Sequence, residues 1–181
     1  MLRPLPIPML ATLPLLFGAP ICVAHAAGGA NCDALIDAQT KAATTPKHMY
    51  ITETAAYKNH RITHSEAIET AGMRYLQVGG KWSSYPYDGK QEAADTAQAW
   101  KEENVKMTCT RTGDEAVDGQ PAALYRVHQT SDAATVDTQI WIASGSGLPL
   151  RQTVDMDVGG KLGKSHREIR YDYANVQPPA P

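Results

Sequence analysis

The sequence predicts an α+β fold in which a strongly curved antiparallel sheet carries helices on its concave face. Nine runs of residues between 48 and 176 alternate with a period of two, and Gly-rich or polar turns separate them. One helical pattern precedes these runs, and a second interrupts them after the fourth. Because helices on one face of an antiparallel sheet bury that face, we expect a cavity or groove between the two layers.

The first residues have the pattern of a secretory signal peptide. Arg3 supplies a positive charge, an apolar run is centred on Leu10–Phe17, and Ala24-His25-Ala26 is an A-x-A cleavage pattern. The run is too short and too interrupted by proline to span a bilayer as a helix. We therefore expect a signal peptide over residues 1–26, cleavage after Ala26, and a periplasmic protein that does not span the membrane.

The remainder is expected to be a single domain over residues 27–176, followed by an extended Pro-rich tail over 177–181. Without the signal peptide, 155 residues carry 16 Lys and Arg against 19 Asp and Glu, a net charge of about −3. Nucleic-acid-binding domains usually show a basic stripe. The charge therefore excludes nucleic acid as a partner and argues against an anionic membrane surface.

The cysteine content predicts one disulfide. Cys32 and Cys109 remain after cleavage, and two cysteines in an exported chain are typical of a bridge. Two free, buried thiols are one alternative. Lipidation of Cys22 is another, although Ala19-Pro20-Ile21 before it is a poor match to a bacterial lipobox. Zinc is not expected, because no ligand lies near either thiol at a metal-binding spacing.

The first helix is predicted from Asn31 or Asp33 to about Ala43, with Pro46 ending it. Four strands follow, and Gly79-Gly80 marks a hairpin between the last two. In the first strand Met49, Ile51 and Ala55 share a face. The expected strands cover residues 48–57, 61–69, 73–78 and 81–85, arranged as a meander.

The second helix is predicted from about Gln91 to Glu103, with Ala93, Ala97 and Trp100 on one stripe. Five further strands are expected at 106–112, 122–130, 135–143, 148–157 and 165–176.

The two strands on either side of the turn at residues 144–147 carry apolar side chains at alternate positions. Ile140 and Ile142 share one face of the first, and the next strand is expected to place Leu148, Leu150, Val154 and Met156 on one face. The length of the connecting turn decides whether Trp141 faces Leu150 or Arg151, and the sequence leaves both registers open.

No motif supports catalysis or metal binding. Val158–Ser165 is a near miss to a P-loop, but a strand pattern follows it where a phosphate-binding helix would be needed. Ser144–Gly147 lacks the spacing of a nucleophile elbow. His60, His64 and Glu66 share one strand face, on which four residues span about 13 Å, so the two imidazoles cannot chelate one ion without a bend. We expect no catalytic residue, metal or cofactor.

Three segments in fixed order suggest a family. They are Asp118-Gly-Gln-Pro-Ala-Ala-Leu-Tyr125, Gln139-Ile-Trp-Ile-Ala-Ser-Gly-Ser-Gly-Leu-Pro-Leu-Arg151 and Ile169-Arg-Tyr-Asp-Tyr-Ala-Asn-Val176. Together they resemble the periplasmic lipoprotein-carrier-like superfamily, which includes outer-membrane lipoprotein carriers and sorting factors. The resemblance implies an unclosed β-barrel with helices on its concave side, and binding of a lipid or acyl chain without catalysis.

The expected function is therefore non-catalytic binding of a hydrophobic ligand in the groove between sheet and helices. The alternative is an envelope accessory or sensor protein that uses the same fold to contact another protein, and an enzyme is a third hypothesis. Aromatic and aliphatic side chains are candidates for the ligand site, with ordinary core packing as the competing interpretation. The candidates are Tyr75, Trp82, Trp100, Leu124, Ile140, Ile142, Leu148 and Leu150.

Overall fold

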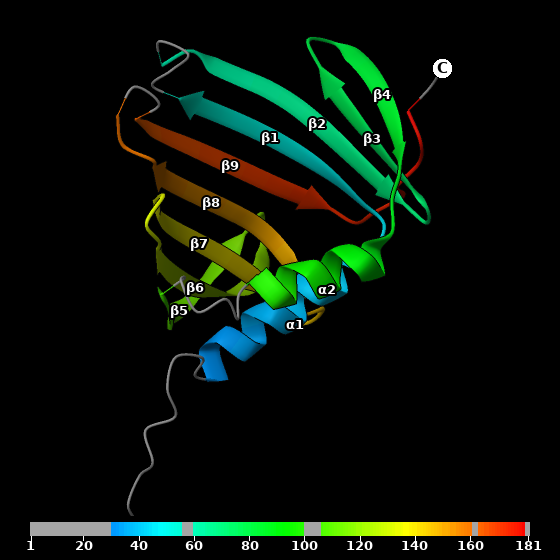
Figure 1. The fold of residues 1–181 in the computed structure, drawn as a ribbon. Coiled ribbons are helices and arrows are strands. Elements are labelled where there is room, and N and C mark those ends of the chain that lie inside the picture. The colour runs from blue at the N-terminus through cyan, green and yellow to red at the C-terminus, as the bar shows by residue number, and fades with distance from the viewer. Residues whose placement is uncertain (1–29, 56–59, 100–105, 161–162, 180–181) are drawn as a thin grey trace, which may run out of the picture.

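The computed structural model describes residues 30–55, 60–99, 106–160 and 163–179. These residues form two helices and a 9-stranded sheet, with both helices on one side of the sheet (Figure 1). The elements are α1 (Ala30–Thr44), β1 (Lys47–Ala55), β2 (Ile62–Thr70), β3 (Met73–Val78), β4 (Lys81–Pro86), α2 (Gly89–Ala99), β5 (Lys106–Val117), β6 (Gln120–Thr130), β7 (Thr135–Ala143), β8 (Pro149–Asp157) and β9 (Lys164–Asp172).

The sheet consists of two meanders joined through the pairing of β1 with β9. Its strand order is β4-β3-β2-β1-β9-β8-β7-β6-β5, and every neighbouring pair is antiparallel. The sheet is strongly curved (Figure 1). Its edge strands β4 and β5 do not pair with each other, so it does not close into a barrel. The expected α+β class, the curved antiparallel sheet and the meander of the first four strands are confirmed.

Two tight hairpins show how the sequence sets the turns. Gly79 and Gly80 have φ values of 59° and 78°, and Asp118 and Gly119 have φ values of 49° and 79°. Two-residue turns of this kind need positive φ at both positions, which Gly adopts without steric cost and Asp tolerates. The predicted hairpin at Gly79-Gly80 is confirmed.

Several predicted boundaries were wrong, those of α2, β5, β6 and β9 among them. Helix α2 begins at Gly89 because the Asp88 carboxylate accepts hydrogen bonds from the backbone N–H groups of Lys90 and Gln91, at 2.9 and 3.2 Å. Strand β5 extends to Val117 and continues past a register shift between Arg111 and Gly113. Strand β9 ends at Asp172, where its pairing with β1 and β8 ends. The predicted last turn of α2, including Trp100, lies outside the described residues.

One apolar cluster lies between α1 and the concave face of the sheet. Leu35 is fully buried in α1 and packs with Val127 of β6 and with Ile140 and Ile142 of β7. Alternation along each strand places these residues on the face that carries the helices. Helix α1 therefore covers the part of the concave face formed by β5 to β8.

A second cluster lies on the convex face of the same strands. Trp141 is buried there, its indole N–H donates to the Glu115 carboxylate at 2.7 Å, and the Arg151 guanidinium lies 5.0 Å from its ring. The register pairs Trp141 with Arg151, and a register shift follows directly. The cluster consists of Val117, Ala122, Leu124, Trp141, Ala143 and Leu150.

The register shift overturns one expectation about faces. Leu150 belongs to the convex cluster with Trp141, whereas Val154 of the same strand lines a cavity on the concave face. The extra residue of a bulge breaks the strict alternation of a strand, so Leu150 and Val154 do not share a face as predicted.

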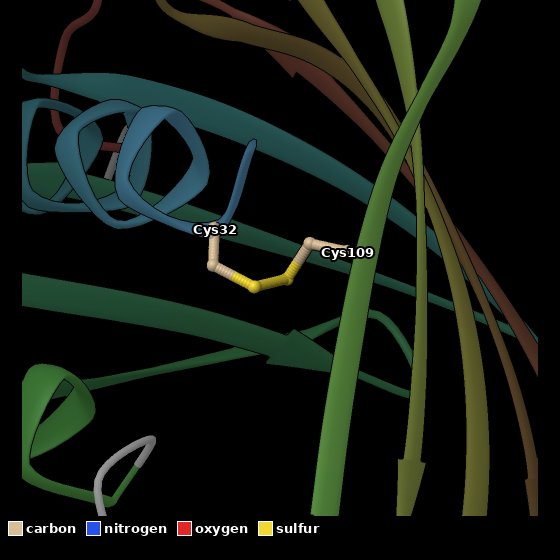
Figure 2. Close-up of a disulfide and its surroundings, with 2 residues drawn as sticks. All are labelled: Cys32 and Cys109. Carbon is tan, nitrogen blue, oxygen red and sulfur yellow. A yellow bond between two sulfur atoms is a disulfide. The ribbon is translucent and has the colours of Figure 1, made fainter. Parts of the chain in front are cut away.

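The predicted disulfide joins Cys32 to Cys109, with their Cα atoms 5.2 Å apart (Figure 2). It connects the first turn of α1 to β5 across 77 residues of sequence. The bridge therefore fixes the N-terminal end of α1 to the edge strand, beside the cluster that contains Leu35.

Candidate functional site

A groove of about 350 Å³ lies between the two helices and the strands β1, β2, β3 and β9. Helices α1 and α2 contact each other, and α1 packs on β5 and β8, so this part of the concave face is not filled by a helix. We call this groove the first chamber. Its apolar lining includes Ile36, Met49, Ile51, Ala67, Leu76 and Ala97.

A charged cluster forms part of the wall of the first chamber. The Glu69 carboxylate binds both the Lys47 ammonium group and the Arg74 guanidinium, whose Nε donates to Glu69 Oε1 at 2.7 Å. The other side of Arg74 contacts Glu92 of α2, with Nη2 at 2.7 and 2.8 Å from the two carboxylate oxygens. The Arg74 guanidinium also lies 4.3 Å from the Tyr87 ring. Three strands and α2 are thereby connected.

The buried part of this cluster stabilises the C-terminal end of α1. The side chains of Lys47 and Glu69 are only 6% and 3% exposed. The Lys47 ammonium donates to the Ala42 carbonyl at 2.7 Å, and the Tyr87 hydroxyl donates to the Ala43 carbonyl at 3.0 Å. These carbonyls are among the last four of the helix and have no partner within it. We therefore assign Lys47 and Tyr87 a structural role as helix caps.

The tyrosines near the groove are held in their neutral form. Burial raises the pKa of Tyr87 well above its usual value, and the Glu69 carboxylate raises it further. Burial also raises the pKa of Tyr171 and Tyr173. For Arg74, burial opposes ionisation, but the carboxylates of Glu92 and Glu69 outweigh it and raise the pKa. The tyrosines of this region are therefore hydrogen-bonding groups, with no ionised phenolate at neutral pH.

A second cavity of about 300 Å³ continues along the concave face over β6, β7 and β8. We call it the second chamber. Gln39 of α1 and Thr96 of α2 line both chambers, so the two meet at these side chains. The apolar lining of the second chamber consists of Val127, Val136, Ile140 and Val154.

The residues predicted from sequence for ligand binding do not come together at one place. Ile140 lines the second chamber, and Ile142 packs beneath α1. Leu124 and Leu150 lie in the convex cluster. Leu148 is buried at the β7–β8 turn. Tyr75 alternates with Arg74 and Leu76 of the first chamber along β3, so it faces the convex side. Trp82 pairs with Gln77, which is on the same face of β3 as Tyr75, so Trp82 faces that side too. Trp100 lies outside the described residues.

None of the residues of the charged cluster was predicted from sequence. A signal for two of them was present, because Lys47 shares a strand face with Met49 and Ile51, and Glu69 shares one with Ala67. A charged residue in line with apolar neighbours is seldom fully buried unless it is paired. Searching each apolar strand face for such residues would have identified Lys47 and Glu69 as a candidate pair.

The side chains of His64 and Glu66 make pairwise contacts with residues of β1. His64 and Glu66 lie on the convex face, where Glu66 contacts His48 at 2.8 Å and His64 contacts the Thr52 hydroxyl at 3.3 Å. Within the described ranges, no three His, Cys, Asp or Glu side chains are placed to hold a metal ion. Within the same ranges, neither helix is long and apolar enough to cross a membrane.

By sequence, the chain matches neither a protein-family model nor a curated protein. Among solved structures it is similar to LprF from Mycobacterium bovis, with 15% identity, a TM-score of 0.42 and coverage of 82% of this chain and 97% of LprF. It is also similar to MucB in a complex with MucA, with 16% identity, a TM-score of 0.47 and coverage of 82% of this chain and 59% of MucB.

A third similar structure is a LolA superfamily protein, NE2245 from Nitrosomonas europaea. The identity is 10%, the TM-score is 0.27, and the alignment covers 77% of this chain and 90% of that protein. The described residues themselves form a nine-stranded unclosed sheet with two helices on its concave face, which is the architecture that the sequence motifs implied.

Proposed function

We propose that this chain is an exported, non-catalytic protein that binds an apolar or amphipathic ligand in the first chamber. The observation that carries the proposal is the unfilled, mainly apolar cavity of about 350 Å³ between the helices and β1–β3. Concave, mostly apolar cavities of about this size are where proteins hold small molecules. The proposal of a periplasmic location is supported by the disulfide, which persists in oxidising compartments.

The lining of the first chamber favours binding over chemistry. Its charged residues are already paired with one another, and Lys47 and Tyr87 are engaged with the end of α1. Its remaining lining is dominated by side chains without a titratable group, such as Met49, Ile51 and Leu76. Transfer of an apolar ligand from water to such a surface is favourable by about 25 cal/mol per Å² buried.

The experiment is native mass spectrometry of protein purified from the periplasm without detergent. We expect an adduct of lipid size on the wild-type chain. In the Leu76→Trp variant, the indole fills the first chamber and the adduct should be lost. Gln77→Trp is the matched control, because Gln77 is the next residue of β3, pairs with Trp82 and faces the convex side.

Two results would overturn the proposal. One is an adduct that is retained equally in Leu76→Trp and in the control, because the ligand would then lie elsewhere. The other is a bare wild-type mass that takes up no added amphiphile. If crosslinking in an envelope extract then yields one stoichiometric protein partner, the accessory or sensor function replaces ligand binding.

A further inference from the structure

The two chambers of the concave face are separated by a polar boundary. Gln39 and Thr96 line both chambers from the side of the helices. From the side of the sheet, Tyr171 lines the first chamber and Gln152 lines the second, and the Tyr171 hydroxyl donates to Gln152 Oε1 at 2.9 Å. We call these four residues the waist. The hydrogen bond leaves the amide nitrogen of Gln152 as a donor at the junction.

The waist is uncharged, in contrast to the far end of the first chamber. Glu92 lies one helical turn before Thr96 in α2, and Ala43 lies one turn after Gln39 in α1. The charged cluster around Glu92 and Arg74 is therefore about one turn away from the waist. A ligand that crosses from one chamber to the other meets amide and hydroxyl groups, without meeting a formal charge.

Size limits what each chamber can hold. A water molecule's share of liquid volume is about 30 Å³, and a methylene group is of similar size. The first chamber, of about 350 Å³, and the second, of about 300 Å³, therefore hold about 12 and about 10 non-hydrogen atoms. Both chambers are open on one side, and a longer chain that stays within the groove crosses the waist. A purely hydrocarbon chain would there remove water from polar groups without replacing its hydrogen bonds.

We propose that the groove binds an amphiphile with two apolar limbs of up to about ten atoms each, joined by an uncharged amide or ester that lies at the waist. This inference rests on the proposed function and adds the class of ligand. The limbs occupy the two chambers, and the linkage exchanges hydrogen bonds with Gln39, Thr96 and Gln152.

The test measures displacement of a fluorescent apolar dye by three probes. N-octyl octanamide has two eight-carbon limbs joined by an amide. Heptadecane has the same chain length but no amide, and octanamide has an amide but a single limb. For wild-type protein we expect N-octyl octanamide to bind at least tenfold more tightly than either of the others. In the protein with Gln39→Leu and Thr96→Val combined, the ratio of the affinities for N-octyl octanamide and heptadecane should fall about threefold to tenfold. The change is of this size because net hydrogen-bond contributions are modest.

A second variant tests the two chambers. The indole in Val154→Trp fills the second chamber. The affinity for N-octyl octanamide should therefore fall to the affinity for octanamide, and the affinity for octanamide should not change. Intact mass with the disulfide formed and an unchanged circular dichroism spectrum confirm that each variant is folded.

Failure of this inference is distinguishable from failure of the proposed function. If heptadecane and N-octyl octanamide bind equally and neither variant changes their ratio, the two-limbed ligand is wrong and groove binding stands. If wild-type protein takes up neither the dye nor any probe, both are wrong.

Discussion

The two halves of the concave face use helix α1 differently. Over β5–β8, the side chains of Leu35 and Ala38 pack directly on Val127, Ile140 and Ile142, and the Cys32–Cys109 bridge holds the helix in place. Over β1–β3, the end of the helix is held by the buried Lys47–Glu69 pair, and apolar side chains face a cavity. The comparison teaches that apolar residues alone do not make a core, because a strand face forms one only where a helix side chain lies against it. Leu35 does so on β6 and β7, and the same strands line the second chamber beyond the reach of α1.

The largest expected effect concerns the half over β5–β8, where the disulfide holds α1. Replacing Cys32 and Cys109 together by Ser should lower the free energy of unfolding by about 4.5 kcal/mol, because the bridge closes a long loop in the unfolded chain. Urea denaturation measures this change. Adding reductant should destabilise the wild-type protein by a similar amount and leave the double variant unchanged. Equal midpoints for wild type and variant would show that α1 does not depend on the bridge.

The next effect concerns the charged anchor of the half over β1–β3. Glu69→Gln should destabilise by about 3–5 kcal/mol, because it leaves the buried Lys47 ammonium without its carboxylate. Adding Lys47→Met to this variant should recover part of the loss, which a double-mutant cycle in urea measures. Additive losses would show that the two side chains do not act as a pair.

A pair of leucine truncations compares the two halves directly. Leu35→Ala should cost about 3 kcal/mol, because Leu35 is 0% exposed and the space it leaves cannot be filled easily. Leu76→Ala should cost about 1 kcal/mol or less, because Leu76 is half-buried and already borders a cavity. Equal losses in thermal or urea denaturation would contradict the distinction between the packed cluster under α1 and the wall of the first chamber.

The smallest expected effect comes from the tyrosines and concerns alkaline pH alone. Their pKa is raised in the folded state, so the stabilisation from keeping Tyr171 and Tyr173 neutral is fully present below the unfolded value near 10 and is lost as the pH rises above it. Stability should be independent of these groups at neutral pH and should fall above about pH 10. Tyr171→Phe should reduce the steepness of that fall, and an unchanged alkaline transition would count against the buried assignment.

Much of the fold could be predicted from sequence because its signals are local. Period-two alternation identified all nine strands, Gly79-Gly80 identified a hairpin, and the cysteine content identified the disulfide. The errors occurred where a local signal was weak or was overridden. Asp88 as a helix cap, the register shift in β5 and the bulge that places Leu150 beside Trp141 each change a boundary or a face without changing the element.

The site was less accessible to sequence reasoning because distant segments build it. The first chamber combines residues of α1, α2 and four strands, and the Glu69 carboxylate meets cations from β1 and β3. Ile140 was anticipated as a ligand-site candidate and does line a chamber, whereas the aromatic candidates Tyr75 and Trp82 face the convex side. Aromatic content alone therefore could not identify the concave surface.

The sequence by itself determined the elements of this protein, the alternation of faces along most strands, and the pair of cysteines that become bridged. Those properties depend on neighbours within a few residues or on the redox compartment. The tertiary structure alone decided which strand faces are covered by α1, where the two chambers meet, and which buried charges are paired. These depend on strand order and register, since a shift of one residue moves a side chain to the opposite face of the sheet.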